Sequence, residues 1–145
     1  FPSSSSQSTN GTTVAGGNGN GPGANQLYYP FGVFISADNS LYVSDINNNR
    51  VQKFPFGSTS STNGTTVADV QSRPINIHVD ASDNIYVLDG DNNRVLLFPA
   101  GMPSLANSAV VAGGNGGGSA ANQLTYPLSI YVDDNNDLYV GDAYN

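Results

Sequence analysis

The chain has 145 residues, about the length of one domain, with 4 Lys and Arg against 11 acidic residues and a formal net charge of −7. Every acidic residue is Asp, and the single His and absent Cys remove the residue types of most zinc sites, cysteine nucleophiles and Glu-based acid–base pairs. Four cations cannot line a phosphate backbone, and the apolar runs are too short to cross a bilayer, so we expect no nucleic-acid partner and no membrane insertion.

The first strand signals lie between residues 12 and 68. Residues 12–15 predict an outermost strand, and a loop rich in Gly and Asn follows at 16–27. Alternating apolar residues then predict four strands joined by turns rich in Asp, Asn, Gly and Ser, at 32–36, 41–45, 50–55 and 65–68. This composition indicates an all-β fold.

The same signals recur along the chain with offsets of 44 and 53 residues. A Leu/Ile-Tyr-Val-x-Asp pattern ends at Asp45, Asp89 and Asp142, and a proline opens each repeat at Pro30, Pro74 and Pro127. The middle repeat lacks most of the Gly/Asn loop that precedes the other two prolines, which accounts for the shorter offset. Four short antiparallel strands in each repeat of about 40–50 residues predict the blades of a β-propeller.

The residues that follow each second strand resemble a known repeat. Asp45 is followed by Asn49-Arg50-Val51, and Asp89 by Asn93-Arg94-Val95. Together with the opening proline and the Phe-Pro that ends the third strand, this phrase resembles the NHL repeat family. The resemblance covers nearly the whole chain and implies an NHL-type β-propeller segment of about three four-stranded antiparallel blades.

The ends of the chain are expected to fall inside blades. Residues 1–15 would end a split blade with its outermost strand, 30–68 and 74–112 would be blades, and 127–145 would supply the inner strands of another split blade. Propellers typically close with about 4–8 blades. Three alternatives for completion remain: a longer parent chain, a two-fold pair, or head-to-tail copies. We expect the N-terminal strand to pair with inner strands of another 145-residue unit, whether the units are linked in a longer chain or assembled head to tail.

The repeat register also predicts a core and a binding face. Alternating positions on the first two strands of each repeat are expected to pack between blades: Val33, Ile35, Tyr42, Ile77, Val79, Tyr86, Ile130, Val132 and Tyr139. Loops that join the second to the third strand, and one blade to the next, emerge on one face of a propeller. That face is predicted to carry polar residues that bind protein or carbohydrate partners: Asp45, Asn47, Asn48, Asp89, Asp91, Asn92, Asp142 and Asn145.

Most of these polar residues also have a structural interpretation. Asp and Asn are the residues that tight turns select, and the alternating Asp and Asn resemble a calcium loop only weakly, because Arg50 and Arg94 stand in place of the turn glycine. Each Arg is better interpreted as the ion-pair partner of its blade's Asp. His78 is interpreted as a packed imidazole, so we predict no catalytic, metal or cofactor site.

Two Asn-Gly-Thr sequons, at Asn10 and Asn63, lie 53 residues apart at equivalent repeat positions and predict N-glycosylation in an extracellular or secreted protein. The sequence thus favours a non-catalytic extracellular scaffold or recognition module that engages protein or carbohydrate, or assembles with further copies into a ring or fibre. The alternative is a fragment of a propeller enzyme, of lyase or lactonase type, whose catalytic residues lie outside this segment.

Overall fold

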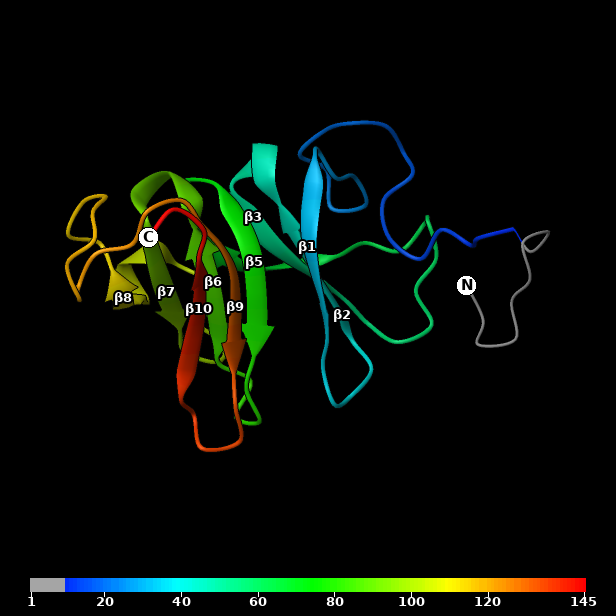
Figure 1. Ribbon diagram of the computed structural model, residues 1–145. Helices are drawn as coiled ribbons and strands as arrows, with labels where there is room; N and C mark the ends of the chain where they lie inside the picture. The colour runs from blue at the N-terminus through cyan, green and yellow to red at the C-terminus, as the bar shows by residue number, and fades with distance from the viewer. Residues whose placement is uncertain (1–9) are drawn as a thin grey trace.

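The computed structural model describes residues 10–145. In these residues the chain forms two four-stranded antiparallel sheets and one two-stranded sheet, which stand side by side (Figure 1). The first sheet contains β1 (Pro30–Ile35), β2 (Leu41–Asp45), β3 (Arg50–Phe54) and β4 (Thr65–Asp69). The second contains β5 (Pro74–Val79), β6 (Ile85–Asp89), β7 (Arg94–Phe98) and β8 (Ala109–Gly113), and the third contains β9 (Pro127–Val132) and β10 (Leu138–Asp142). We call them the first, second and third blades.

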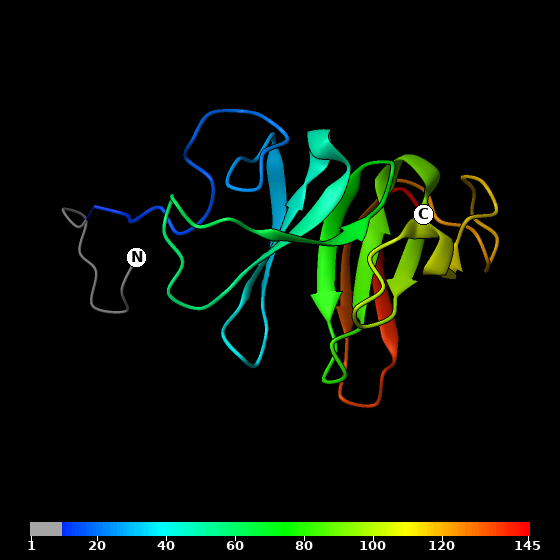
Figure 2. The same ribbon diagram turned by 180° about the vertical axis from the view of Figure 1, so that it is seen from behind.

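The strand order follows the chain in each blade, so β1, β5 and β9 are the innermost strands and lie next to one another. Viewed from either side, the described chain begins beside the first blade and ends in the third (Figures 1 and 2). Residues 10–145 also contain three 3₁₀ turns, η1 (Ile46–Asn48), η2 (Gly90–Asn92) and η3 (Leu105–Asn107). Within residues 10–145 no helix has the length and hydropathy needed to cross a membrane. The predicted all-β, propeller-type segment is confirmed.

Turn chemistry explains much of the Asp and Asn content. The hairpin between the first two strands places a residue in the left-handed region in every blade, at Asn39 (φ 61°), Asp83 (φ 62°) and Asn136 (φ 64°). The turn after the second strand does the same at Asn49 and Asn93. Asn and Asp adopt this conformation at lower cost than other non-glycine residues, so their repeated positions follow from the backbone.

Two apolar clusters hold the blades together. Between the first and second blades, Tyr42, Val51 and Ala68 pack in one buried cluster with Ile77 and Val79. The cluster between the second and third blades joins four buried residues of the second blade to two of the third: Ile75, Tyr86, Leu88, Val95, Ile130 and Val132. Side chains therefore pack mainly between sheets, as alternation along each strand requires.

Three of the predicted core residues are exposed. Val33 and Ile35 lie on the side of the first blade that faces away from the second, and Tyr139 lies on the outer side of the third blade. Their exposed fractions are 65%, 57% and 56%, whereas the other six predicted core residues are buried. The register is the same in each case; what differs is that no neighbouring blade covers these two sides among the described residues.

The predicted outermost strand at 12–15 does not form, and residues 10–29 contain no strand. In the other blades the outermost strand pairs with a third strand, as β4 does with β3 and β8 with β7. No such strand stands beside residues 12–15 in the described chain, so their backbone groups have no ladder to join. Residues 1–9, including the aligned Phe1-Pro2, lie outside the described residues.

Candidate binding face

The loop that enters each blade is hydrogen-bonded to the turn after that blade's second strand, so both lie at the same end of the blade. The bonds run from Asn47 N to the Tyr28 carbonyl at 3.0 Å, from Gly90 N to the Arg73 carbonyl at 3.0 Å, and from Tyr144 N to the Thr125 carbonyl at 3.2 Å. We call this end of the blades the loop face. The polar residues predicted to bind partners all belong to it or to the strand ends beneath it.

Asp45 is fully buried beneath the loop face and its carboxylate is surrounded by donors. Tyr28 N donates to Oδ1 at 2.6 Å, while Asn48 Nδ2 and Arg50 Nε donate to Oδ2 at 2.8 Å. The predicted ion pair with Arg50 is confirmed, and it joins neighbouring strands because the two residues are opposite each other in the β2–β3 register.

Arg50 also anchors the entering loop. Its Nη1 donates to the Pro22 carbonyl at 2.9 Å, and its Nη2 donates to the carbonyls of Gly23 and Gln26 at 2.9 and 3.1 Å. One guanidinium therefore connects the buried carboxylate of Asp45 to three backbone oxygens of the loop. This use of all three guanidinium nitrogens could not be replaced by the single ammonium of Lys.

The second and third blades repeat the aspartate with different partners. Asp89 is fully buried and accepts from Arg94 Nε at 2.7 Å and from Asn92 Nδ2 at 2.9 Å, which confirms the second predicted ion pair. Asp142 is half-buried and accepts from Thr125 N at 2.7 Å and Asn145 Nδ2 at 2.8 Å. All three carboxylates hold their own blade together.

Of the predicted face residues, Asn47, Asp91, Asn92 and Asn145 are exposed, and Asn48 is half-buried. Asn48, Asn92 and Asn145 each turn their amide nitrogen toward the aspartate of their own blade. Recognition of a partner by these residues stays a prediction. Within residues 10–145 the side chain of Asn47 makes no hydrogen bond, while that of Asp91 lies 3.6 Å from Arg73.

The two long loops share an internal set of hydrogen bonds that the sequence analysis did not identify. In the first loop, Asn18 Nδ2 donates to the Asn25 carbonyl at 3.0 Å, and Gln26 Nε2 donates to the Asn18 carbonyl at 2.9 Å. The second loop repeats both bonds with the same 97-residue offset, from Asn115 to Asn122 at 2.9 Å and from Gln123 to Asn115 at 3.0 Å. We call this arrangement the amide clasp; the recurrence of Asn and Gln at matching loop positions was its signal in the sequence.

A pocket of about 140 Å³ opens on the loop face where the three blades meet. The side chains that line it are mostly apolar, with one cation: Phe31, Ile46, Arg73, Ile75, Tyr126 and Leu128. Arg73 Nη1 is 3.6 Å from Asp91 Oδ1, and both side chains are about half exposed. We call this hollow the junction pocket. It was missed from sequence because its residues come from three different repeats.

Two tyrosines have strained backbones, and one of them, Tyr126, lines the junction pocket. Tyr29 and Tyr126 occupy the position before the opening proline in their repeats, where the middle repeat has Arg73. Their φ angles are 58° and 55°, a region that bulky residues rarely adopt, yet their side chains are 63% and 55% exposed. The ring of Tyr126 meets that of Tyr144 edge to face, with centroids 5.4 Å apart.

His78 packs in a row of rings on the innermost strands. Its imidazole centroid is 4.7 Å from the ring of Phe34 and 5.2 Å from that of Tyr131, the residues at the same repeat position in the first and third blades. Burial lowers the pKa of His78 below its usual value, and the charge of Asp80 partly opposes this effect. The packed interpretation of the imidazole matches this geometry.

Residues 10–145 bring no three Asp or His side chains together in a metal-binding arrangement. The described chain therefore shows neither the calcium site that the alternating Asp and Asn weakly resemble nor a zinc site. Asn10 and Asn63, the two sequon residues, are both exposed.

A comparison with solved structures finds a β-propeller. The match titled "Streptogramin B lyase structure" has a TM-score of 0.53 and 14% sequence identity, and it covers 78% of this chain and 34% of the lyase chain. The sequence matches no family model and no curated protein. This chain therefore spans about a third of the length of the structure it resembles, and the likeness, together with the three antiparallel sheets, shows that its fold is of the β-propeller type.

Proposed function

We propose that this chain is a non-catalytic, NHL-type propeller scaffold and recognition module, and that its junction pocket binds a neutral carbohydrate. The observation that carries the proposal is the junction pocket with Tyr126, an exposed tyrosine at positive φ that lines it. A bulky residue in the left-handed region costs on the order of 1–3 kcal/mol, and such strain is concentrated at functional sites. Gly or Asn would adopt this backbone conformation at lower cost than Tyr29 and Tyr126 do. We therefore infer that these positions are tyrosine because of the ring.

The chemistry of the junction pocket suits a sugar ring. Small-molecule sites are mostly apolar, with a few polar groups that fix the orientation of the ligand. Phe31, Tyr126 and Leu128 offer apolar surface for the C–H face of a pyranose. Arg73 supplies donors for its hydroxyls, and the carboxylate of Asp91, 3.6 Å from Arg73, is the nearest charged acceptor to that guanidinium. The net charge of −7 disfavours acidic glycans, so the proposed ligand is neutral.

The test is titration of the protein with a panel of neutral mono- and oligosaccharides, followed by calorimetry or ligand-observed NMR. Arg73→Ala and Tyr126→Asn are the informative variants, because Asn keeps the left-handed backbone while removing the ring. We expect each variant to weaken binding at least tenfold. Met102→Asn is the control, since Met102 is 50% exposed and does not line the junction pocket. Equal binding by all three variants, or no saccharide bound by the wild type, would contradict the proposal.

We also propose that the protein is secreted and glycosylated. The support is the exposure of Asn10 and Asn63 at equivalent positions of two repeats, while the third repeat has Asn-Ser-Ala at 107–109 and serves as an internal control. Intact mass of material made in a eukaryotic secretory pathway should fall after amidase treatment. Asn10→Gln and Asn63→Gln should each remove one glycan, and an unchanged mass would remove the argument for secretion.

A further inference from the structure

Each blade has two sides that pack against neighbours. We call the side toward the preceding blade the leading face and the side toward the following blade the trailing face. The leading faces carry Ile77 and Val79 in the second blade and Ile130 and Val132 in the third, all buried. The trailing faces carry Tyr42 in the first blade and Tyr86 in the second, also buried.

The same positions are open at the two ends of the array. Val33 and Ile35, on the leading face of the first blade, are 65% and 57% exposed, and Tyr139, on the trailing face of the third, is 56% exposed. Inside the molecule, the apolar pair of each leading face packs with the tyrosine of the preceding trailing face. The first blade leaves such a pair uncovered and the third blade leaves such a tyrosine uncovered, so the two open faces are complementary in the same way.

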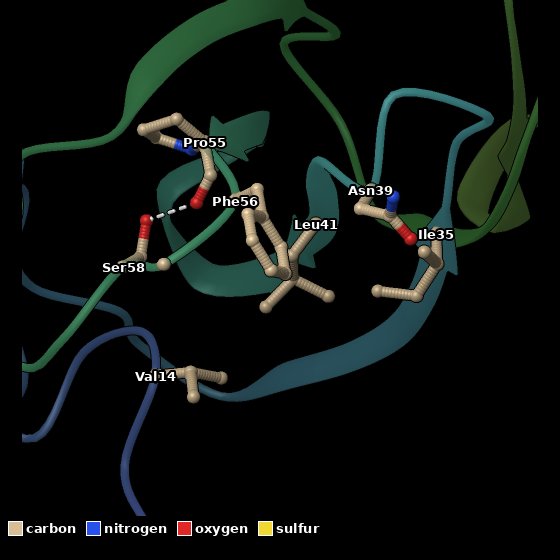
Figure 3. A pocket seen from close by; sticks show the side chains of 8 residues that line it. Val14, Ile35, Asn39, Leu41, Pro55, Phe56 and Ser58 are labelled. Atoms are coloured by element: carbon tan, nitrogen blue, oxygen red, sulfur yellow. Dashed lines mark hydrogen bonds between the residues drawn. The ribbon is translucent and has the colours of Figure 1, made fainter.

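The leading face of the first blade also has a hollow of a size to accept an aromatic ring. It measures about 400 Å³, and Figure 3 shows Val14, Ile35, Leu41 and Phe56 arranged around it. Phe56 is 79% exposed.

The corresponding hollow of the second blade is filled. The residues equivalent to Val14, Ile35 and Leu41 are Val67, Val79 and Ile85, and these pack with Tyr42 in one cluster. Within this chain, then, the occupant of such a hollow includes the tyrosine of a preceding trailing face.

The row of aromatic rings on the innermost strands points to the same partner. Phe34, His78 and Tyr131 contact one another in turn, and the row ends at Tyr131, which is 57% exposed. In a second copy that follows the third blade, the residue at this repeat position is Phe34. A blade with the residues of this chain's own first blade would therefore extend both the row of rings and the apolar packing.

We infer that a second copy of this chain docks its trailing face, through Tyr139, onto the leading face of the first, through Val33 and Ile35. On the innermost strands this contact would bring Tyr131 of the second copy beside Phe34 of the first, so that the row of rings continues from one copy to the next. The contact is head to tail, so it joins unlike surfaces and leaves each copy with one open face for the next contact. It deepens the scaffold part of the proposed function and uses none of the junction pocket, so either proposal can fail without the other.

Cysteine cross-linking tests the contact directly, because the sequence has no cysteine of its own. Val33→Cys and Tyr139→Cys are prepared separately, mixed at high concentration and treated with a short thiol-reactive cross-linker. We expect the mixture to give covalent dimers that contain one copy of each variant, in clear excess over dimers of either variant alone. Val110→Cys is the matched control, since Val110 is 50% exposed on β8 of the second blade and lies on neither open face.

Sedimentation of the uncross-linked chain gives an independent readout. The wild type should associate with rising concentration, and Val33→Asp or Tyr139→Asp should weaken the association at least tenfold with an unchanged circular dichroism spectrum, because both positions are exposed in the single copy. Self-dimers of each cysteine variant in equal or greater yield would overturn the head-to-tail contact. A wild type that remains monomeric would overturn the second copy as occupant and assign the open faces to a different partner.

Discussion

The leading faces of the first and second blades occupy the same place in the repeat, but one is exposed and the other is buried. On the second blade the leading-face pair Ile77 and Val79 is 3% and 6% exposed, and on the first blade the equivalent pair Val33 and Ile35 is more than half exposed. The side chains are of similar size and the strands have similar registers. Burial at these positions is therefore a property of the neighbouring blade, which alternation along one strand does not specify.

The largest expected effect comes from the buried ion pair of the second blade. Arg94→Ala should lower the free energy of unfolding by about 3–5 kcal/mol, because it leaves the fully buried carboxylate of Asp89 without its cation. In the third blade, Asp142 is half-buried and holds its loop without an Arg among the described residues. Asp142→Ala should cost less than about 1 kcal/mol.

Chemical denaturation of both variants checks this difference. Similar losses of unfolding free energy for Arg94→Ala and Asp142→Ala would show that the interactions of the two aspartates contribute equally to stability. The difference in burial between the interior blade and the open one would then have no effect on stability at these positions.

The second prediction exchanges matched residues on the two leading faces. Ile77→Ala should destabilise the fold by about 2–5 kcal/mol, since it removes buried methyl groups from the cluster between the first and second blades. Val33→Ala, measured at a concentration where the chain is monomeric, should change stability by less than about 0.5 kcal/mol. A loss below about 0.5 kcal/mol for Ile77→Ala would mean that the register of the blades is wrong.

The smallest effect concerns pH. The pKa of His78 is lowered in the folded state by burial, so the unfolded chain binds this proton more readily than the folded one. The stability contributed by the neutral imidazole is present above the unfolded pKa of about 6.5 and is lost as the pH falls through the lowered folded value. Thermal unfolding between about pH 7 and pH 5 should show this loss.

His78→Phe is the matched variant, because the first blade has Phe34 at the same position and its ring already packs against His78. It should remove the part of the pH dependence that belongs to His78. The same slope in the variant would assign it to the aspartates.

Much of the fold could be predicted because each repeat contains its own turn signals. The predicted strands at 41–45 and 50–55 agree with β2 and β3 to within one residue, since the Asp and Asn turns between them are local in sequence. The Asp45–Arg50 pair was also predictable, as both residues belong to one hairpin.

Features that need a partner from elsewhere could not be predicted in this way. Residues 12–15 have the composition of a strand but no third strand beside them in the described chain, and Tyr139 has the composition of a core residue but no blade over it. The junction pocket combines single residues of three blades, and only the positions around each opening proline hinted at it.

The amide clasp has a consequence for how the two long loops behave. Their composition is that of a flexible linker, rich in Gly and Asn, for which rapid cleavage by proteases would be the ordinary expectation. Asn18 and Gln26 in one loop, and Asn115 and Gln123 in the other, instead tie each loop to its own backbone, and the side-chain oxygen of Gln123 lies so near Gly118 that a Cβ there would clash. The two loops are therefore ordered before any ligand binds at the loop face, and little of the binding free energy would be spent on ordering the chain.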